Sequence, residues 1–130
     1  MKLRISEWQM RGIFNAVNFE QQAANGVIKE WVRKVNPVDP TRTRIDENVP
    51  LGSVTNDVRY LDKNNNEICR AHRYIRPDGT IGGKGRTDPK TIFVGETKYH
   101  QNSPGKEPDV VLTEEEIQRI ATEIIELISR

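Results

Sequence analysis

The chain has few of the residues that build covalent cross-links or metal centres: its 130 residues include one cysteine and two histidines. A lone cysteine, Cys69, excludes an internal disulfide framework and is typical of proteins from a reducing compartment. The cysteine and the histidines lie apart along the chain, without the ligand spacing of a zinc site. We therefore expect no resident metal or cofactor. Cys69 falls on a predicted core position, where a thiol is usually inert.

Long apolar runs are also missing. No stretch approaches the roughly 18 apolar residues of a membrane span. Lys2, Arg4, Glu7 and Arg11 interrupt the region where a signal peptide would lie. Neither sign of charge dominates, because 20 basic and 19 acidic side chains leave a net charge of +1. We expect a cytoplasmic protein that does not bind membranes, folded as one domain of ordinary size over residues 1–130.

Residues 1–36 are expected to be helical. Ser6 and Gln9 have capping-box spacing, so Ser6 is a candidate N-cap. Two apolar stripes with helical intervals follow, and they indicate either two helices broken near Asn18 or one longer helix. The first stripe is Met10, Ile13, Phe14 and Val17, and the second is Ala24, Val27, Ile28, Trp31, Val32 and Val35. Pro37 ends the pattern, since the residue before a proline avoids the helical region. Residues 37–56 then form a connector that is mobile or wraps along the core.

Residues 57–101 are expected to form a β meander. The four predicted strands are Asp57–Asp62, Glu67–Arg76, Thr91–Val94 and Thr97–Gln101. Short turns between them indicate antiparallel pairing. The last helix, 113–130, begins with a capping box of Thr113 and Glu116 and carries one apolar stripe. These elements predict an α+β fold with N-terminal helices, a small antiparallel sheet of about four short strands, and an amphipathic C-terminal helix.

Charge is distributed unevenly along the chain. Residues 67–106 carry eight basic and four acidic side chains, whereas residues 107–130 carry two basic and seven acidic ones. Two interpretations follow. In the first, the acidic helix packs near the basic β segment and neutralises it. In the second, the basic surface faces outwards and meets phosphate groups.

The predicted strand Glu67–Arg76 carries the side chains best suited to recognition. Alternation divides them between two faces. Ile68, Arg70, His72, Tyr74 and Arg76 share one face, and Cys69, Ala71, Arg73 and Ile75 share the other. The second set is smaller and more apolar, so we expect it to face the core. The first set combines arginine, which offers a fork of N–H groups to phosphate, with tyrosine, on which a base can stack.

A glycine-rich loop, GTIGGKGR over residues 79–86, follows this strand. It is not a Walker loop, because the Lys-Ser or Lys-Thr pair is absent, and it opens no predicted helix. Its glycines allow close approach to an anion, but we expect chiefly a mobile tip that closes over a ligand. The leading prediction is binding of a phosphate-rich ligand, nucleic acid or nucleotide. The candidate ligand-binding residues are Arg70, His72, Arg73, Tyr74, Arg76, Lys84, Arg86 and Lys90.

Two nuclease hypotheses are alternatives, so the sequence leaves open whether the protein is an enzyme. Asp78 after Pro77, followed later by Glu96 and Lys98, is similar to the loose PD…ExK pattern of the PD-(D/E)XK nuclease superfamily. That resemblance implies Mg²⁺ held by the two carboxylates and a lysine that supports the attacking water. It is weakened because both carboxylates fall in predicted turns. His72 and His100 form the other hypothesis, metal-free cleavage of RNA by general acid–base catalysis.

A non-enzymatic protein–protein interaction module, such as a small regulator or inhibitor, is the remaining alternative. The apolar stripe of the last helix is wide and can pack on the core or seal a homodimer. Trp8 and Trp31 are further candidate anchors for a protein partner. Packing of the helix on the core is the expectation.

Overall fold

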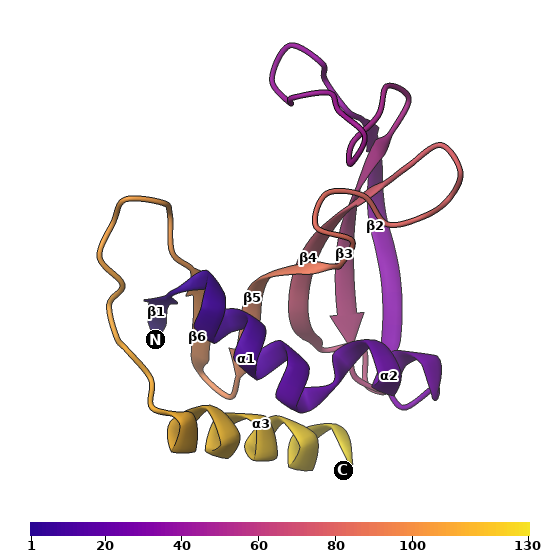
Figure 1. Ribbon diagram of the computed structural model, residues 1–130. Helices are drawn as coiled ribbons and strands as arrows, with labels where there is room; N and C mark the ends of the chain where they lie inside the picture. The colour runs from indigo at the N-terminus through magenta and orange to yellow at the C-terminus, as the bar shows by residue number, and fades with distance from the viewer.

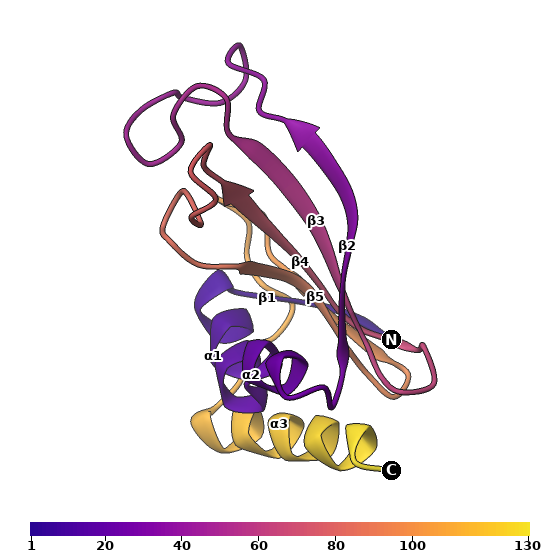
Figure 2. The same ribbon diagram turned by 90° about the vertical axis from the view of Figure 1, so that its right-hand side faces the viewer.

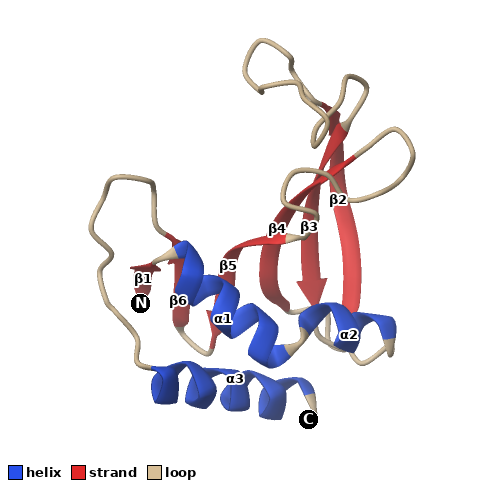
Figure 3. Ribbon diagram, viewed as in Figure 1, coloured by secondary structure: helices blue, strands red, loops and turns tan.

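The computed structural model describes residues 1–130 as an α+β fold. Its elements follow in chain order: β1 (Lys2–Ile5), α1 (Glu7–Val17), α2 (Phe19–Ala24), β2 (Lys29–Pro37), β3 (Val54–Leu61), β4 (Glu67–Ile75), β5 (Asp88–Val94), β6 (Thr97–Gln101) and α3 (Glu114–Ile128). The three helices lie together below the sheet, and two long loops project from its opposite end (Figures 1 and 3). The predicted fold class is therefore confirmed, with more strands than expected.

The sheet has six strands in the order β1-β6-β5-β4-β3-β2. Every neighbouring pair is antiparallel except β1 and β6, which are parallel. The short β1 was not predicted, because four residues are too few to show a period. Strands β2, β3 and β4 are long and curve away from the helices, so part of the sheet extends beyond them (Figure 2).

Residues 29–36, predicted to be helical, form most of strand β2 instead. Helix α2 stops at Ala24, and Gly26 follows with a φ of +79°, which is unfavourable for other residues. Strand β2 pairs with β3, with Val32 opposite Val58. All nine residues of β2 are exposed, so its apolar side chains form no buried helical stripe. Aromatic and β-branched residues such as Trp31 favour a strand, and pairing with β3 stabilises the strand over the helix.

The helix boundaries follow local signals. The Ser6 hydroxyl accepts a hydrogen bond from the Gln9 backbone N–H at 3.1 Å, and α1 ends at Asn18, whose φ is +62°. Helix α3 begins with the predicted reciprocal capping box between Thr113 and Glu116. None of the helices has both the length and the apolar character needed to span a membrane.

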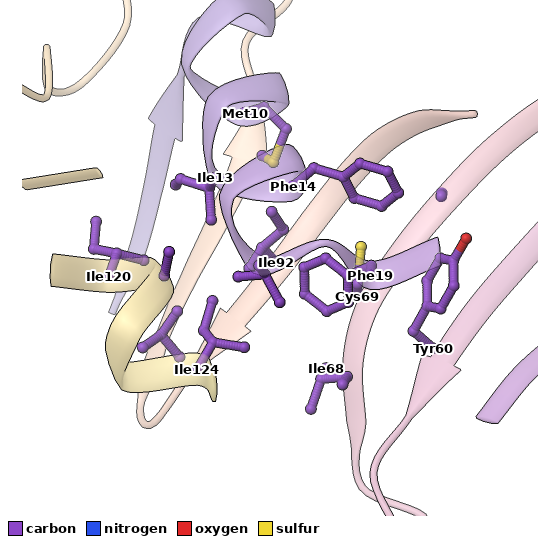
Figure 4. Close-up of a cluster of buried hydrophobic side chains, with 14 of the residues drawn as sticks. Met10, Ile13, Phe14, Phe19, Tyr60, Ile68, Cys69, Ile92, Ile120 and Ile124 are labelled. Atoms are coloured by element: carbon purple, nitrogen blue, oxygen red, sulfur yellow. The ribbon is translucent and has the colours of Figure 1, made fainter. Parts of the chain in front are cut away.

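The core lies between the helices and one face of the sheet, called here the inner face. Met10, Ile13 and Phe14 of α1 point toward the sheet, and Ile120 and Ile124 of α3 close the cluster from below (Figure 4). The remaining members shown there include Phe19, Tyr60, Ile68, Cys69 and Ile92. Burial of Cys69 raises the pKa of its thiol, in agreement with an inert core cysteine. Helix α3 therefore packs on α1 and the sheet, as its stripe predicts.

The two projecting loops are anchored to each other. Residues 38–53 join β2 to β3, and Val49 within them is buried. The backbone N–H of Gly83 donates to the Asn48 carbonyl at 2.9 Å, and that of Gly82 donates to the Tyr74 carbonyl at 2.8 Å. The Nε atom of Arg76 also donates to Asn48, at 3.1 Å. The expectation of a free glycine-rich tip is therefore wrong for its first half, which packs on β4 and the connector.

Candidate nucleic-acid interface

The outer face of β4, away from the helices, is neutralised by acids of its own sheet. Arg70 donates two hydrogen bonds to the Glu67 carboxylate, which also accepts one from Arg59 at 2.6 Å. Asp57 on β3 accepts from Arg59 at 3.1 Å. Partial burial opposes ionisation of Glu67, but the two arginine hydrogen bonds outweigh it and lower the pKa of that carboxyl. Arg70 is thus committed to a network within the sheet.

Other predicted ligand residues also have partners within the protein. The Arg73 guanidinium donates to Glu30 at 2.9 Å, although its Nε atom is buried without a partner. Lys90 lies 2.7 Å from the Asp88 carboxylate. Arg76 is a structural residue, because it donates to the carbonyls of Asn48 and Ile81 and holds the two loops together. The strand is therefore a weaker binding surface than its sequence suggests.

A basic hollow lies where the glycine-rich loop folds back toward the start of α1. Its volume is about 180 Å³. It is lined by Glu7, Arg11, His72, Arg73, Tyr74, Gly82, Gly83, Lys84, Arg86 and Asp88. Five predicted residues, His72, Arg73, Tyr74, Lys84 and Arg86, are thus brought together, whereas Arg70, Arg76 and Lys90 do not line it. Four arginine or lysine side chains face two carboxylates, so the hollow carries an excess of positive charge.

Glycine is required at the back of this hollow. A Cβ atom on Gly82 would lie 2.7 Å from the Asn48 carbonyl oxygen and 3.1 Å from the Cβ of Tyr74. Gly83 has a φ of +60° and faces the Tyr74 ring. The N–H groups of Gly82, Gly83 and Gly85 all donate to protein carbonyls, so these three do not form an anion nest. The glycines position Lys84 and Arg86 rather than contact an anion through their backbone.

Arg11 and Arg86 are the least neutralised cations of the region. Neither forms an ion pair. Arg11 donates to the carbonyl of Thr87 and lies over the Phe14 ring at 5.5 Å from its centre. Burial, followed by the positive charge of Arg86, lowers the pKa of the Arg11 guanidinium. Neither guanidinium is neutralised by an ion pair, although Glu7 and Asp88 line the same hollow, so the two arginines favour an incoming anion.

A second hollow, called here the outer groove, has a volume of about 470 Å³ and shares Arg11, Lys84 and Arg86 with the first. Its lining is Ser6, Glu7, Trp8, Arg11, Lys84 and Arg86. Lys84 lies 3.4 Å from the Glu7 carboxylate, and both side chains remain largely exposed. Trp8 is 82% exposed, which is unusual for an indole. This outer groove adds an aromatic surface to the basic hollow.

The two histidines do not form a paired catalytic site. They lie on β4 and β6, which are separated by β5. Two strand spacings, about 10 Å in total, therefore separate the two strands across the sheet. His72 pairs with Asp88 and His100 with Thr91, three residues further along β5. Burial, followed by nearby lysines, lowers the pKa of both imidazoles, which favours their neutral forms.

The carboxylates of the Mg²⁺ hypothesis are not brought together either. Asp78 precedes β5 and its carboxylate caps its own turn through Thr80, at 2.6 Å to the hydroxyl. Glu96 lies in the turn that follows β5, so the length of that strand separates the two. Lys98 on β6 lies over the Phe93 ring. No group of three or more His, Cys, Asp or Glu side chains is placed to hold a metal ion.

The acidic helix packs on α1 and the sheet, but it does not neutralise the basic segment through ion pairs. None of the ion pairs involves α3, and its glutamates lie mainly on its exposed side. The apolar stripe of α3 is largely buried, so α3 offers no open apolar face to a partner. Exposed apolar side chains of the sheet lie on β2, where Trp31 is 51% and Val35 57% exposed. A docking partner would therefore meet β2, or Trp8 on α1, rather than α3.

Arg11 and Trp8 were missed as candidate ligand residues. Both lie on α1 off its buried stripe, and their spacing of three residues places them on one side of a helix. This signal is present in the sequence, but it does not show which distant segment faces them. Comparison with protein-family models, with curated proteins and with solved structures finds no match to this chain. The functional proposal consequently depends on the geometry of the site.

Proposed function

We propose that the protein binds nucleic acid through the phosphate groups, using Arg11, Lys84 and Arg86. The observation that carries the proposal is the convergence of Arg11 and Arg86, neither ion-paired, on the same hollows. They come from α1 and from the glycine-rich loop, so the fold creates the cluster rather than the local sequence. Arginine suits this role because its planar fork matches a phosphate group.

The size of the basic hollow favours one small anionic group over a whole small-molecule ligand. Its volume of about 180 Å³ lies below the roughly 300–1,000 Å³ of typical small-molecule pockets. The outer groove of about 470 Å³ shares Arg11, Lys84 and Arg86 with it. A chain of phosphates that enters the hollow and continues along the groove fits this shape.

The dependence of binding on salt tests the proposal. A fluorescently labelled oligonucleotide of mixed sequence is titrated with the protein, and anisotropy gives Kd at several salt concentrations. Three phosphate contacts predict a slope of about −2 in log K against log salt for a single strand. That slope corresponds to a loss of about 20-fold between roughly 50 and 200 mM salt.

Substitution of Arg86 provides the local test. Arg86→Ala removes one phosphate contact, so we expect weaker binding and a salt slope shallower by ~0.7. Arg119→Ala is the matched control, because Arg119 is also exposed and unpaired but lies on α3, away from the hollow. The proposal is refuted if no oligonucleotide binds at low salt, or if the two variants weaken binding equally.

A further inference from the structure

We infer that the preferred ligand is a single strand, with one unpaired base stacked on the indole of Trp8. This inference rests on the proposed function, because it takes the phosphate-binding role of Arg11, Lys84 and Arg86 as given. It adds the uncharged residue Trp8 to the proposed site and a preference for single-stranded over double-stranded nucleic acid. Neither follows from positive charge alone.

Trp8 is placed as a stacking platform. It is the most exposed large hydrophobic residue of the chain, at 82%, and belongs to no aromatic pair. Trp8 lines the outer groove and also a third hollow, whose lining includes Gly12 and Asn15. Arg11 lines both hollows. An indole that is this exposed and borders two hollows can accept a planar group on its ring.

The neighbours of Trp8 explain why the planar group is a base. Arg11, Lys84 and Arg86 line the same groove as the indole, so an aromatic surface and three cations face one ligand. Proteins that bind single strands combine these two components, with bases on aromatic rings and phosphates on basic side chains. In a duplex the bases are stacked on each other and present only their edges. An exposed indole beside phosphate-binding residues therefore favours the unpaired form.

Glu7 limits the affinity of the groove. Its carboxylate lies 3.4 Å from Lys84 Nζ and faces the same space as the proposed phosphate path. An incoming phosphate must compete with it for Lys84 and is repelled by its charge. Removal of this charge is expected to tighten binding, an effect that a purely structural role of Glu7 would not produce. One unit charge at about 4 Å in water is worth about fivefold in Kd.

The experiment compares four labelled ligands. They are a single-stranded DNA oligonucleotide, the same oligonucleotide as RNA, its duplex, and inorganic polyphosphate, which has no bases. We expect the single strand to bind more tightly than the duplex. Trp8→Ala should raise its Kd by about 5- to 150-fold, the range for loss of one stacked base. Trp8→Phe should retain most of the affinity, and Glu7→Gln should lower Kd about fivefold. Circular dichroism checks that each variant is folded, as expected at exposed positions.

Stacking also gives a spectroscopic signal. In a Trp31→Phe background Trp8 is the remaining tryptophan, and a base stacked on it should quench its fluorescence. Polyphosphate should bind without this quenching. If the single strand binds but neither quenches Trp8 nor responds to Trp8→Ala, the stacking inference is overturned while the phosphate site survives. If no nucleic acid binds, both proposals fail. A difference between DNA and RNA would show which source of single strands the groove prefers.

Discussion

Gly82 is the residue on which the shape of the candidate site depends most directly. A Cβ atom added there would lie 2.7 Å from the Asn48 carbonyl oxygen and 3.1 Å from the Cβ of Tyr74. The first is a backbone atom and the second is fixed to a strand, so neither can move aside cheaply. Gly82→Ala must therefore push the loop away from β4 and the connector.

The magnitude follows from the contacts that this shift disturbs. The hydrogen bonds from Gly82 N–H to Tyr74 and from Gly83 N–H to Asn48 lie in the same turn. Each is worth about 1 kcal/mol net, which predicts a loss of about 2 kcal/mol. Overpacking of a filled site costs about 1–3 kcal/mol, in agreement. For a chain of this size, about 2 kcal/mol lowers Tm by about 6–10 °C.

Urea denaturation measures the loss in free energy of unfolding. The transition is followed by far-UV circular dichroism, because the exposed tryptophans report poorly on the core. Gly85→Asn is the control: it adds a larger side chain to the same loop, where a Cβ meets nothing within 4 Å. Asparagine tolerates the positive φ of +77° at Gly85. We expect the control to stay within about 0.5 kcal/mol of the wild type. A Gly82→Ala variant as stable as the control would contradict the assigned packing of the loop.

Two further predictions concern the core and the histidines. Ile124→Ala, at a position 1% exposed, should lower the free energy of unfolding by about 2–5 kcal/mol. Ile125→Ala, on the flank of α3, should lower it by less. Equal decreases in the urea midpoint of the two variants would contradict the assigned helix face. Burial lowers the pKa of His72 and His100, so below a pH of about 6.5 the unfolded chain binds protons more readily and the folded state loses stability. That loss, measured between about pH 7.5 and 5.5, should shrink in a His72→Gln/His100→Gln double variant. An unchanged pH dependence would show that other groups cause it.

Several elements depend on local signals and could be predicted from the sequence alone. The capping residues Ser6 and Thr113 mark the starts of α1 and α3, because a side-chain oxygen and an N–H group three residues apart suffice to form the bond. The turn at Gly95-Glu96 fixes the β5–β6 hairpin in the same local way. The buried stripe of α3 was also predictable, since its period of 3.6 continues over fifteen residues.

Strand β2 and the candidate site depend instead on contacts between distant segments. The apolar spacing in residues 24–35 fits a helix, but pairing with β3 supplies backbone hydrogen bonds that local propensity does not reveal. Charge counts showed a basic segment without showing that Glu67 and Glu30 neutralise Arg70 and Arg73. Arg11 joins the site because the chain returns to α1 more than seventy residues later. A cluster assembled from segments so distant has no local pattern, which is why the sequence indicated phosphate binding but identified the binding surface only in part.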